Sequence, residues 1–252
     1  MIECRKFGYS ILDAHAHIGY SFDGYRMSPE EQLHSMDILG IEKMLASNLH
    51  ALYFDPVQGN REMADVAARY PERILGYVAV NPHHMEGWEA YLNEMLALPN
   101  MVGIKLHPDF NSYPTNGPQY HRIYEYANRH RLLVLNHYFG DVKTIVELAK
   151  SYPHMKMICG HRCAYPNLDE IRYLRDNLAD RRDIYFDTTS SCVAYGAIER
   201  YCEYLGSERI LFGTDTPYFD PAYQVGRFLW CGLNDRDRRN ILRENMWNLI
   251  TK

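Results

Sequence analysis

Short apolar runs alternate along the chain with longer segments in which apolar positions recur every three or four residues. The short runs predict strands at residues 10–16, 42–47, 74–80, 102–106, 132–136, 155–159, 184–187 and 210–213. The longer segments predict helices at residues 30–39, 61–70, 87–98, 120–130, 142–151, 168–178 and 197–205. Continuous apolar strands separated by helices are typical of a parallel sheet that helices cover.

Eight such units in a chain of 252 residues predict an α/β fold, a slightly elaborated (β/α)8 TIM barrel. An open doubly wound sheet is the competing fold, but no glycine-rich phosphate loop follows any predicted strand. Residues 235–250 predict a C-terminal amphipathic helix that closes the outer layer of the barrel. Since no linker or low-complexity segment interrupts the pattern, we expect residues 1–252 to form a single domain.

Charge and composition narrow the classes of partner. The net charge of −5 leaves no basic footprint for nucleic acid, so we expect no nucleic-acid partner. No apolar run is long enough to cross a membrane, and the first residues lack the apolar core of a signal peptide. We therefore expect a cytoplasmic protein without a membrane partner. The six cysteines are scattered, which fits reduced thiols rather than a disulfide framework.

Polar side chains stand at the ends of several predicted strands, and catalytic groups of a TIM barrel come from the carboxyl ends of its strands. In the run Asp13-Ala14-His15-Ala16-His17, strand alternation places His15 and His17 on one face. Four other predicted strands end in Lys105 and His107, in His137, in His161 and in Asp215. Imidazoles and carboxylates are ligands of divalent transition metals, and a metal ion compensates buried carboxylate charge. The sequence therefore predicts a metal site.

The ordered set of motifs resembles the amidohydrolase superfamily, in particular its amidohydrolase-related (amidohydrolase 2) branch of barrel-fold metal-dependent hydrolases. The resemblance extends over the whole chain. It rests on the His-x-His of residues 15–17, the Gly-Ile-Lys-Leu-His-Pro segment at 103–108, His137, the Gly-His pair at 160–161 and the Gly-Thr-Asp-Thr-Pro turn at 213–217.

This resemblance implies a divalent metal ion, most readily Zn2+, although Mn2+ or Fe2+ also suits these ligand types. The implied metal ligands are His15, His17, His137 and Asp215, with His161 beside or on the metal; one ion is favoured over two. Asp215 would take a proton from the metal-activated water, and His161 would polarise the substrate or protonate its leaving group.

Three further residues are predicted to bind substrate, namely Lys105, His107 and Arg162. Lys105 has two alternatives. In amidohydrolases with two metals, a lysine at this place is carboxylated and bridges the ions. In the second alternative, Lys105 is an interior lysine paired with a carboxylate such as Asp187.

The resemblance leaves the reaction open. The main expectation is a metal-dependent hydrolase that acts on an amide, ester or lactone-type carbonyl of a small molecule. The second is a metal-dependent, non-oxidative decarboxylase of an aromatic or unsaturated carboxylic acid. The third is a barrel that binds a metal ion or a ligand without turnover. Because the decarboxylases of this branch carry longer strand loops, the compact chain favours hydrolysis.

Aromatic residues are abundant in the loops that follow the predicted strands. They are expected to line either a pocket for a ring-bearing substrate or the interface of a possible homodimer. These residues are Tyr20, Phe22, Tyr25, Tyr53, Phe54, Phe110, Tyr113, Tyr138, Phe139, Tyr165, Tyr195, Tyr218 and Phe219.

Overall fold

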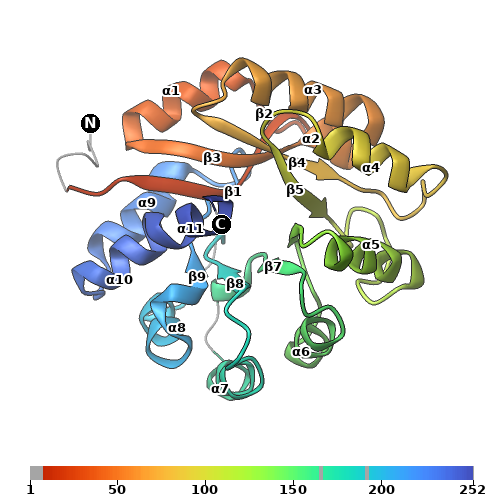
Figure 1. The fold of residues 1–252 in the computed structure, drawn as a ribbon. Helices are drawn as coiled ribbons and strands as arrows, with labels where there is room; N and C mark the ends of the chain where they lie inside the picture. The colour runs from red at the N-terminus through yellow and green to blue at the C-terminus, as the bar shows by residue number, and fades with distance from the viewer. Residues whose placement is uncertain (1–7, 165–166, 191–192, 252) are drawn as a thin grey trace.

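The computed structural model describes residues 8–164, 167–190 and 193–251, and Figure 1 shows strands at its centre with helices around them. Eight strands run parallel in chain order. They are β1 (Ile11–Tyr20), β3 (Ile41–Asn48), β4 (Ile74–Ala79), β5 (Met101–Leu106), β6 (Leu133–Asn136), β7 (Lys156–Cys159), β8 (Ile184–Asp187) and β9 (Ile210–Leu211). The short β2 (Arg26–Met27), which the sequence pattern did not predict, pairs antiparallel with the end of β1.

Backbone hydrogen bonds between β1 and the chain beyond β9 close the sheet. The Ala14 N–H donates to the Phe212 carbonyl at 2.9 Å, and the His17 N–H donates to the Thr216 carbonyl at 2.7 Å. These bonds join the first strand to the last, which is the defining step of barrel closure. The predicted TIM-barrel fold is confirmed.

Helices follow the strands and cover the outside of the barrel (Figure 1). They are α1 (Pro29–Leu39), α2 (Leu49–Tyr53), α3 (Pro56–Arg69), α4 (Trp88–Leu96), α5 (Pro118–Arg129), α6 (Val142–Ser151), α7 (Leu168–Asn177), α8 (Ala197–Leu205) and α9 (Pro221–Trp230). Short 3-10 turns lie at η2 (Arg162–Ala164) and η3 (Ser207–Arg209). No helix of the described residues is both long and apolar enough to span a membrane.

The C-terminal helical segment consists of α10 (Asp235–Arg239), the π-helical η4 (Asn240–Glu244) and α11 (Asn245–Thr251). It is present as predicted, but it does not lie only in the outer layer. Met246 and Leu249 pack in one cluster with Leu12, Leu75 and Leu133, which are the first or second residues of their strands. This helix therefore covers the amino ends of the strands, and the carboxyl ends stay free to carry a site.

Capping residues explain why the observed start of α3 differs from the predicted one. α3 begins at Pro56, five residues before the prediction, because the Asp55 carboxylate caps the N–H groups of Val57 and Gln58. The helices α2 and α9 were not predicted; the first has only five residues.

The described cysteines are free, as expected: Cys159, Cys163, Cys202 and Cys231. Cys4, Cys192 and Tyr165 lie outside the described residues.

Candidate metal centre

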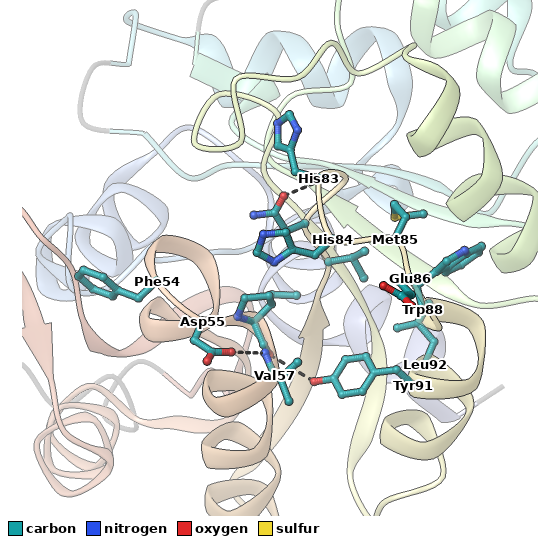
Figure 2. A pocket seen from close by; sticks show the side chains of 14 residues that line it. Phe54, Asp55, Val57, His83, His84, Met85, Glu86, Trp88, Tyr91 and Leu92 are labelled. Atoms are coloured by element: carbon teal, nitrogen blue, oxygen red, sulfur yellow. Dashed lines mark hydrogen bonds between the residues drawn. The ribbon is translucent and has the colours of Figure 1, made fainter.

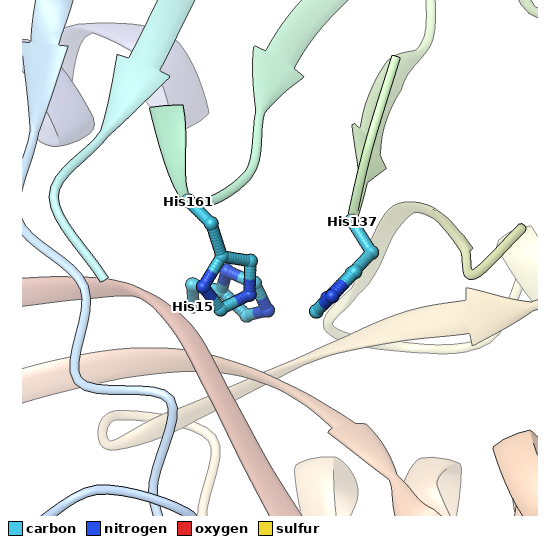
Figure 3. A group of neighbouring side chains, drawn as sticks. All are labelled: His15, His137 and His161. Atoms are coloured by element: carbon cyan, nitrogen blue, oxygen red, sulfur yellow. The ribbon is translucent and has the colours of Figure 1, made fainter. Parts of the chain in front are cut away.

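The barrel brings the predicted site residues together at the carboxyl ends of its strands. His15 and His17 lie on β1, Lys105 is on β5 and His107 follows it, and His137, His161 and Asp215 follow β6, β7 and β9. Three overlapping groups have donor atoms within 4.8 Å of one another. The first is His15 with His17 and Asp215, the second is His15 with His137 and His161, and the third, with an exposed carboxylate, is His107 with Asp109 and His137. Figure 3 shows the side chains of the second group converging from three strands.

The first group is fully buried and compact. The Oδ1 atom of Asp215 lies 3.0 Å from His17 Nε2 and 3.4 Å from His15 Nε2. Contacts on the other side orient both rings, because His15 Nδ1 lies 2.8 Å from Asp187 Oδ2 and His17 Nδ1 lies 2.8 Å from Ser47 Oγ. Each Nε2 atom therefore faces Asp215. Metal-binding histidines are commonly oriented in this way, by a hydrogen-bond partner on the other ring nitrogen.

Electrostatics keeps these side chains in the protonation states of metal ligands. Burial lowers the pKa values of His15 and His17, so both imidazoles are neutral at pH 7. Burial would raise the pKa of Asp215, but the hydrogen bond with His17 and the charges of His161 and Lys105 outweigh burial and lower this pKa. Neutral imidazoles beside an ionised carboxylate are suitable ligands for a divalent ion.

The second group carries unpaired polar atoms. His137 Nδ1 and His161 Nε2 are buried and have no hydrogen-bond partner, a situation that is costly unless a ligand or ion meets them. The His161 Nε2 atom lies 3.7 Å from Asp215 Oδ2, and the rings of His161 and His137 are 4.2 Å apart. The donors of the first two groups fit a divalent ion on these grounds.

Backbone conformation marks two of these residues. His161 and Asp215 have φ angles of 56°, in the left-handed region that side chains rarely adopt. Such conformations cost about 1 kcal/mol or more and concentrate at functional sites. Hydrogen bonds hold both turns, since the His161 N–H donates to the Asp187 carboxylate at 2.7 Å and the Asp215 N–H donates to the His15 carbonyl at 2.7 Å.

Lys105 is fully buried inside this cluster, and its Nζ lies 2.6 Å from His15 Nε2. Burial lowers the pKa of Lys105 to about 8, although the carboxylates of Asp215 and Asp187 oppose that shift. The Asp187 carboxylate hydrogen-bonds to His15, and the described residues show no hydrogen bond or ion pair between Lys105 and Asp187, although the Asp187 charge acts on Lys105. The Lys105 ammonium thus lies next to the proposed metal ligand His15.

The other two predicted substrate-binding residues lie in different places. His107 lines the pocket above the cluster, stacked between the Phe110 ring at 3.5 Å and the His137 ring at 3.8 Å. Arg162 is not among the residues that line this pocket, and its guanidinium pairs with Glu170 on α7. A substrate role for Arg162 stays a prediction.

The pocket has a volume of about 340 Å3. Buried residues such as Asp215 form its floor, and exposed loop residues such as Asp23 form its mouth. Its lining consists of His17, Asp23, Tyr25, Tyr53, His107, Phe110, His137, His161, Asp215, Tyr218 and Phe219. The aromatic members belong to the loop set that the sequence singled out, whereas Asp23 was not predicted. Asp187 and Ser47, which orient the histidines, were also missed as site residues.

A larger cavity of about 640 Å3 lies between the start of α3 and the loop before α4 (Figure 2). Its lining includes Asp55, His83, His84 and Trp88, and the Tyr91 hydroxyl donates to the Pro56 carbonyl across it. It contains none of the predicted metal ligands, so the smaller pocket is the candidate site.

Comparison with known proteins agrees with this fold. A family model described as amidohydrolase matches residues 12–245, and the chain belongs to that family. No curated protein sequence matches the chain.

Solved structures with the same fold include three decarboxylases. The 5-carboxyvanillate decarboxylase of Sphingomonas paucimobilis aligns at 14% identity and a TM-score of 0.76, covering 96% of this chain and 98% of that one. The 2,6-dihydroxybenzoate decarboxylase of Rhizobium aligns at 15% identity with the same TM-score and coverage of 96% and 98%. The 5-carboxyvanillate decarboxylase of Novosphingobium aromaticivorans, complexed with manganese, aligns at 12% identity and a TM-score of 0.74, covering 97% of each chain.

Proposed function

We propose that the protein is a metal-dependent lyase that removes CO2 from an aromatic carboxylic acid without oxidation. The observation that carries the proposal is an aromatic-walled pocket directly above the buried donor cluster, with the unpaired His161 Nε2 at its floor. The similarity to three decarboxylases of aromatic acids supports this reaction over the hydrolysis that the sequence first favoured.

Ring contacts give the pocket its shape. The Tyr53 and Phe110 rings are 4.2 Å apart, and the Tyr25 and Tyr218 rings are 4.9 Å apart. Aromatic walls of this kind bind a planar ring through dispersion and edge or offset stacking. The substrate ring would lie between these walls, with its carboxylate toward Asp215.

A single divalent ion held by His15, His17, His137 and Asp215 would supply Lewis acidity at the substrate carboxylate. Manganese is the ion that we propose in place of zinc, because the similar decarboxylase of Novosphingobium aromaticivorans is complexed with it, as is a structurally similar dihydroxybenzoic acid decarboxylase of Polaromonas. Imidazole and carboxylate ligands accept either metal.

The residues of the chain carry the proton. His161 donates a proton from Nε2 to the ring carbon that bears the carboxylate. The bond between that carbon and the carboxyl carbon then breaks, its electron pair returns to the ring, and CO2 leaves. Asp215, 3.7 Å from His161 Nε2, stabilises the protonated imidazole, while Lys105 and His107 orient the acid.

The test is release of CO2 by the manganese-loaded protein from a panel of hydroxybenzoates, run beside a panel of esters, amides and lactones. We expect CO2 and the phenol in equal amounts. A His161→Asn variant should lose about 100- to 10,000-fold in kcat, the usual contribution of a general acid, whereas His154→Asn on the surface should keep full activity. Hydrolysis of the second panel, without CO2 from the first, would overturn the proposal.

A further inference from the structure

The loop between β1 and β2, residues 21–25, forms one wall of the pocket and is tightly built. The Ser21 N–H donates to the Tyr25 carbonyl at 2.9 Å, and the Gly24 N–H donates to the Ser21 carbonyl at 3.3 Å. Gly24 has a φ of 91°, which a residue with a side chain rarely adopts. The Ser21 hydroxyl donates to the Asp23 carboxylate, so this loop holds Asp23 in place at the pocket.

Two ring contacts fasten the loop to the opposite side of the pocket mouth. Phe22 packs edge-on against Tyr53 at 5.1 Å, and Tyr25 packs against Tyr218 at 4.9 Å. The two partners are themselves joined, because the Tyr218 hydroxyl donates to the Tyr53 oxygen at 2.7 Å. The wall that carries Asp23 is therefore a fixed part of the pocket rather than a loose surface loop.

Away from the proposed metal ion and the protonated His161 at the floor, the charged side chains of the lining are carboxylates. Asp215 lies at the floor and Asp23 at the mouth, and the described lining residues include no lysine or arginine. Burial raises the pKa of Tyr53, the hydrogen bond with Tyr218 opposes that shift, and the negative charges of Asp23 and Asp215 add to it. A ligand that fills the pocket from floor to mouth thus meets a fixed negative charge at its outer end.

We infer that Asp23 is a specificity-determining residue that restricts the substrate to aromatic acids with a single carboxylate. One carboxylate of the acid is attracted to the floor by the metal ion, but a second on the outer edge of the ring approaches Asp23, and the described lining offers no lysine or arginine to neutralise it. A hydroxyl group at that edge carries no charge and can hydrogen-bond to the carboxylate of Asp23. The inference rests on the proposed function in one respect only, namely that the ligand is an aromatic acid whose carboxylate lies toward the floor of the pocket.

Calorimetric titration of the manganese-loaded protein tests this without turnover. The matched ligands are 3-hydroxybenzoate and benzene-1,3-dicarboxylate, which differ by one hydroxyl or carboxylate. We expect the wild type to bind the hydroxy acid about tenfold more tightly, since like charges a few ångströms apart in a partly solvated pocket interact on this scale. Asp23→Asn should remove most of that preference by strengthening dicarboxylate binding.

Asp65→Asn is the control, because Asp65 is an exposed carboxylate on α3 outside the pocket and changes the net charge equally. It should leave both affinities unchanged. The preference of the wild type should also shrink in high salt, which screens the repulsion. An Asp23→Asn protein that keeps the wild-type preference, or a wild type that binds neither acid, overturns the inference. Failure to release CO2 despite the expected binding pattern would refute only the proposed function.

Discussion

Asp187 organises the proposed metal centre without being one of its ligands, and its replacement by asparagine gives a sharp prediction. Its buried carboxylate lies 2.8 Å from His15 Nδ1 and accepts hydrogen bonds from the His161 N–H at 2.7 Å and the Thr189 hydroxyl at 2.6 Å. Asparagine keeps the size but removes the charge. The His15 ring then loses the anion that fixes its proton on Nδ1 and makes Nε2 a better donor.

The loss of the Asp187 charge should affect metal affinity and folding stability to different degrees. Loss of a carboxylate behind a metal-binding histidine costs about 10- to 100-fold in metal affinity, or about 1.4–2.7 kcal/mol. Folding stability should change much less, because burial raises the pKa of Asp187 and the ionised form therefore pays a desolvation cost that asparagine avoids. We expect the metal-free Asp187→Asn protein to unfold within about 1 kcal/mol of the wild type.

The assay is competition for the metal ion with a chelating dye, combined with denaturant unfolding of the metal-free protein. Asp183→Asn is the matched control, because Asp183 directly precedes β8 and pairs with Arg181 at 2.8 Å, away from the site. It should keep wild-type metal affinity. If Asp187→Asn binds the metal within twofold of the wild type, His15 is not a ligand oriented in the way described.

Three further variants test other parts of the account. Lys105→Met should keep the metal content at one ion per chain by elemental analysis, and a fall from two ions to one would instead identify a bridging lysine. Asn60→Leu should destabilise the fold by about 3 kcal/mol in urea unfolding, because the Asn60 amide pairs with both the N–H and the carbonyl of buried Ala79 at 2.8 Å. Gly59→Ala should cost about 2 kcal/mol in the same assay, since its Cβ would lie 2.2 Å from the Ala51 backbone nitrogen; wild-type stability would refute this packing.

The sequence predicted the barrel because its strands are buried on both faces and therefore appear as continuous apolar runs. The same logic located the histidines, since a residue that ends a parallel strand must lie at the common rim. α9 was not predicted, although Asp220 and Pro221 form a capping signal at its start. The placement of the C-terminal helix depended on long-range packing of Met246, which periodicity does not specify.

Residues that orient a metal ligand, or that face the pocket from a loop, were harder to predict from the sequence. Asp187 ends a strand like the histidines do, but only the folded chain shows that its carboxylate reaches His15 rather than Lys105. Asp23 stands in a loop, where no periodic pattern indicates which side chains face a pocket. Arg162 shows the opposite case, because its position after His161 suggested a substrate contact while its guanidinium pairs with Glu170. A homodimer and the cytoplasmic location stay predictions.

The most direct test of the metal centre is elemental analysis of the purified, manganese-reconstituted protein after removal of free ions. We expect about one tightly held divalent ion per chain, as is usual for a site of neutral imidazoles and an ionised carboxylate. A protein that retains no metal after reconstitution would contradict the assignment of His15, His17, His137 and Asp215 as ligands.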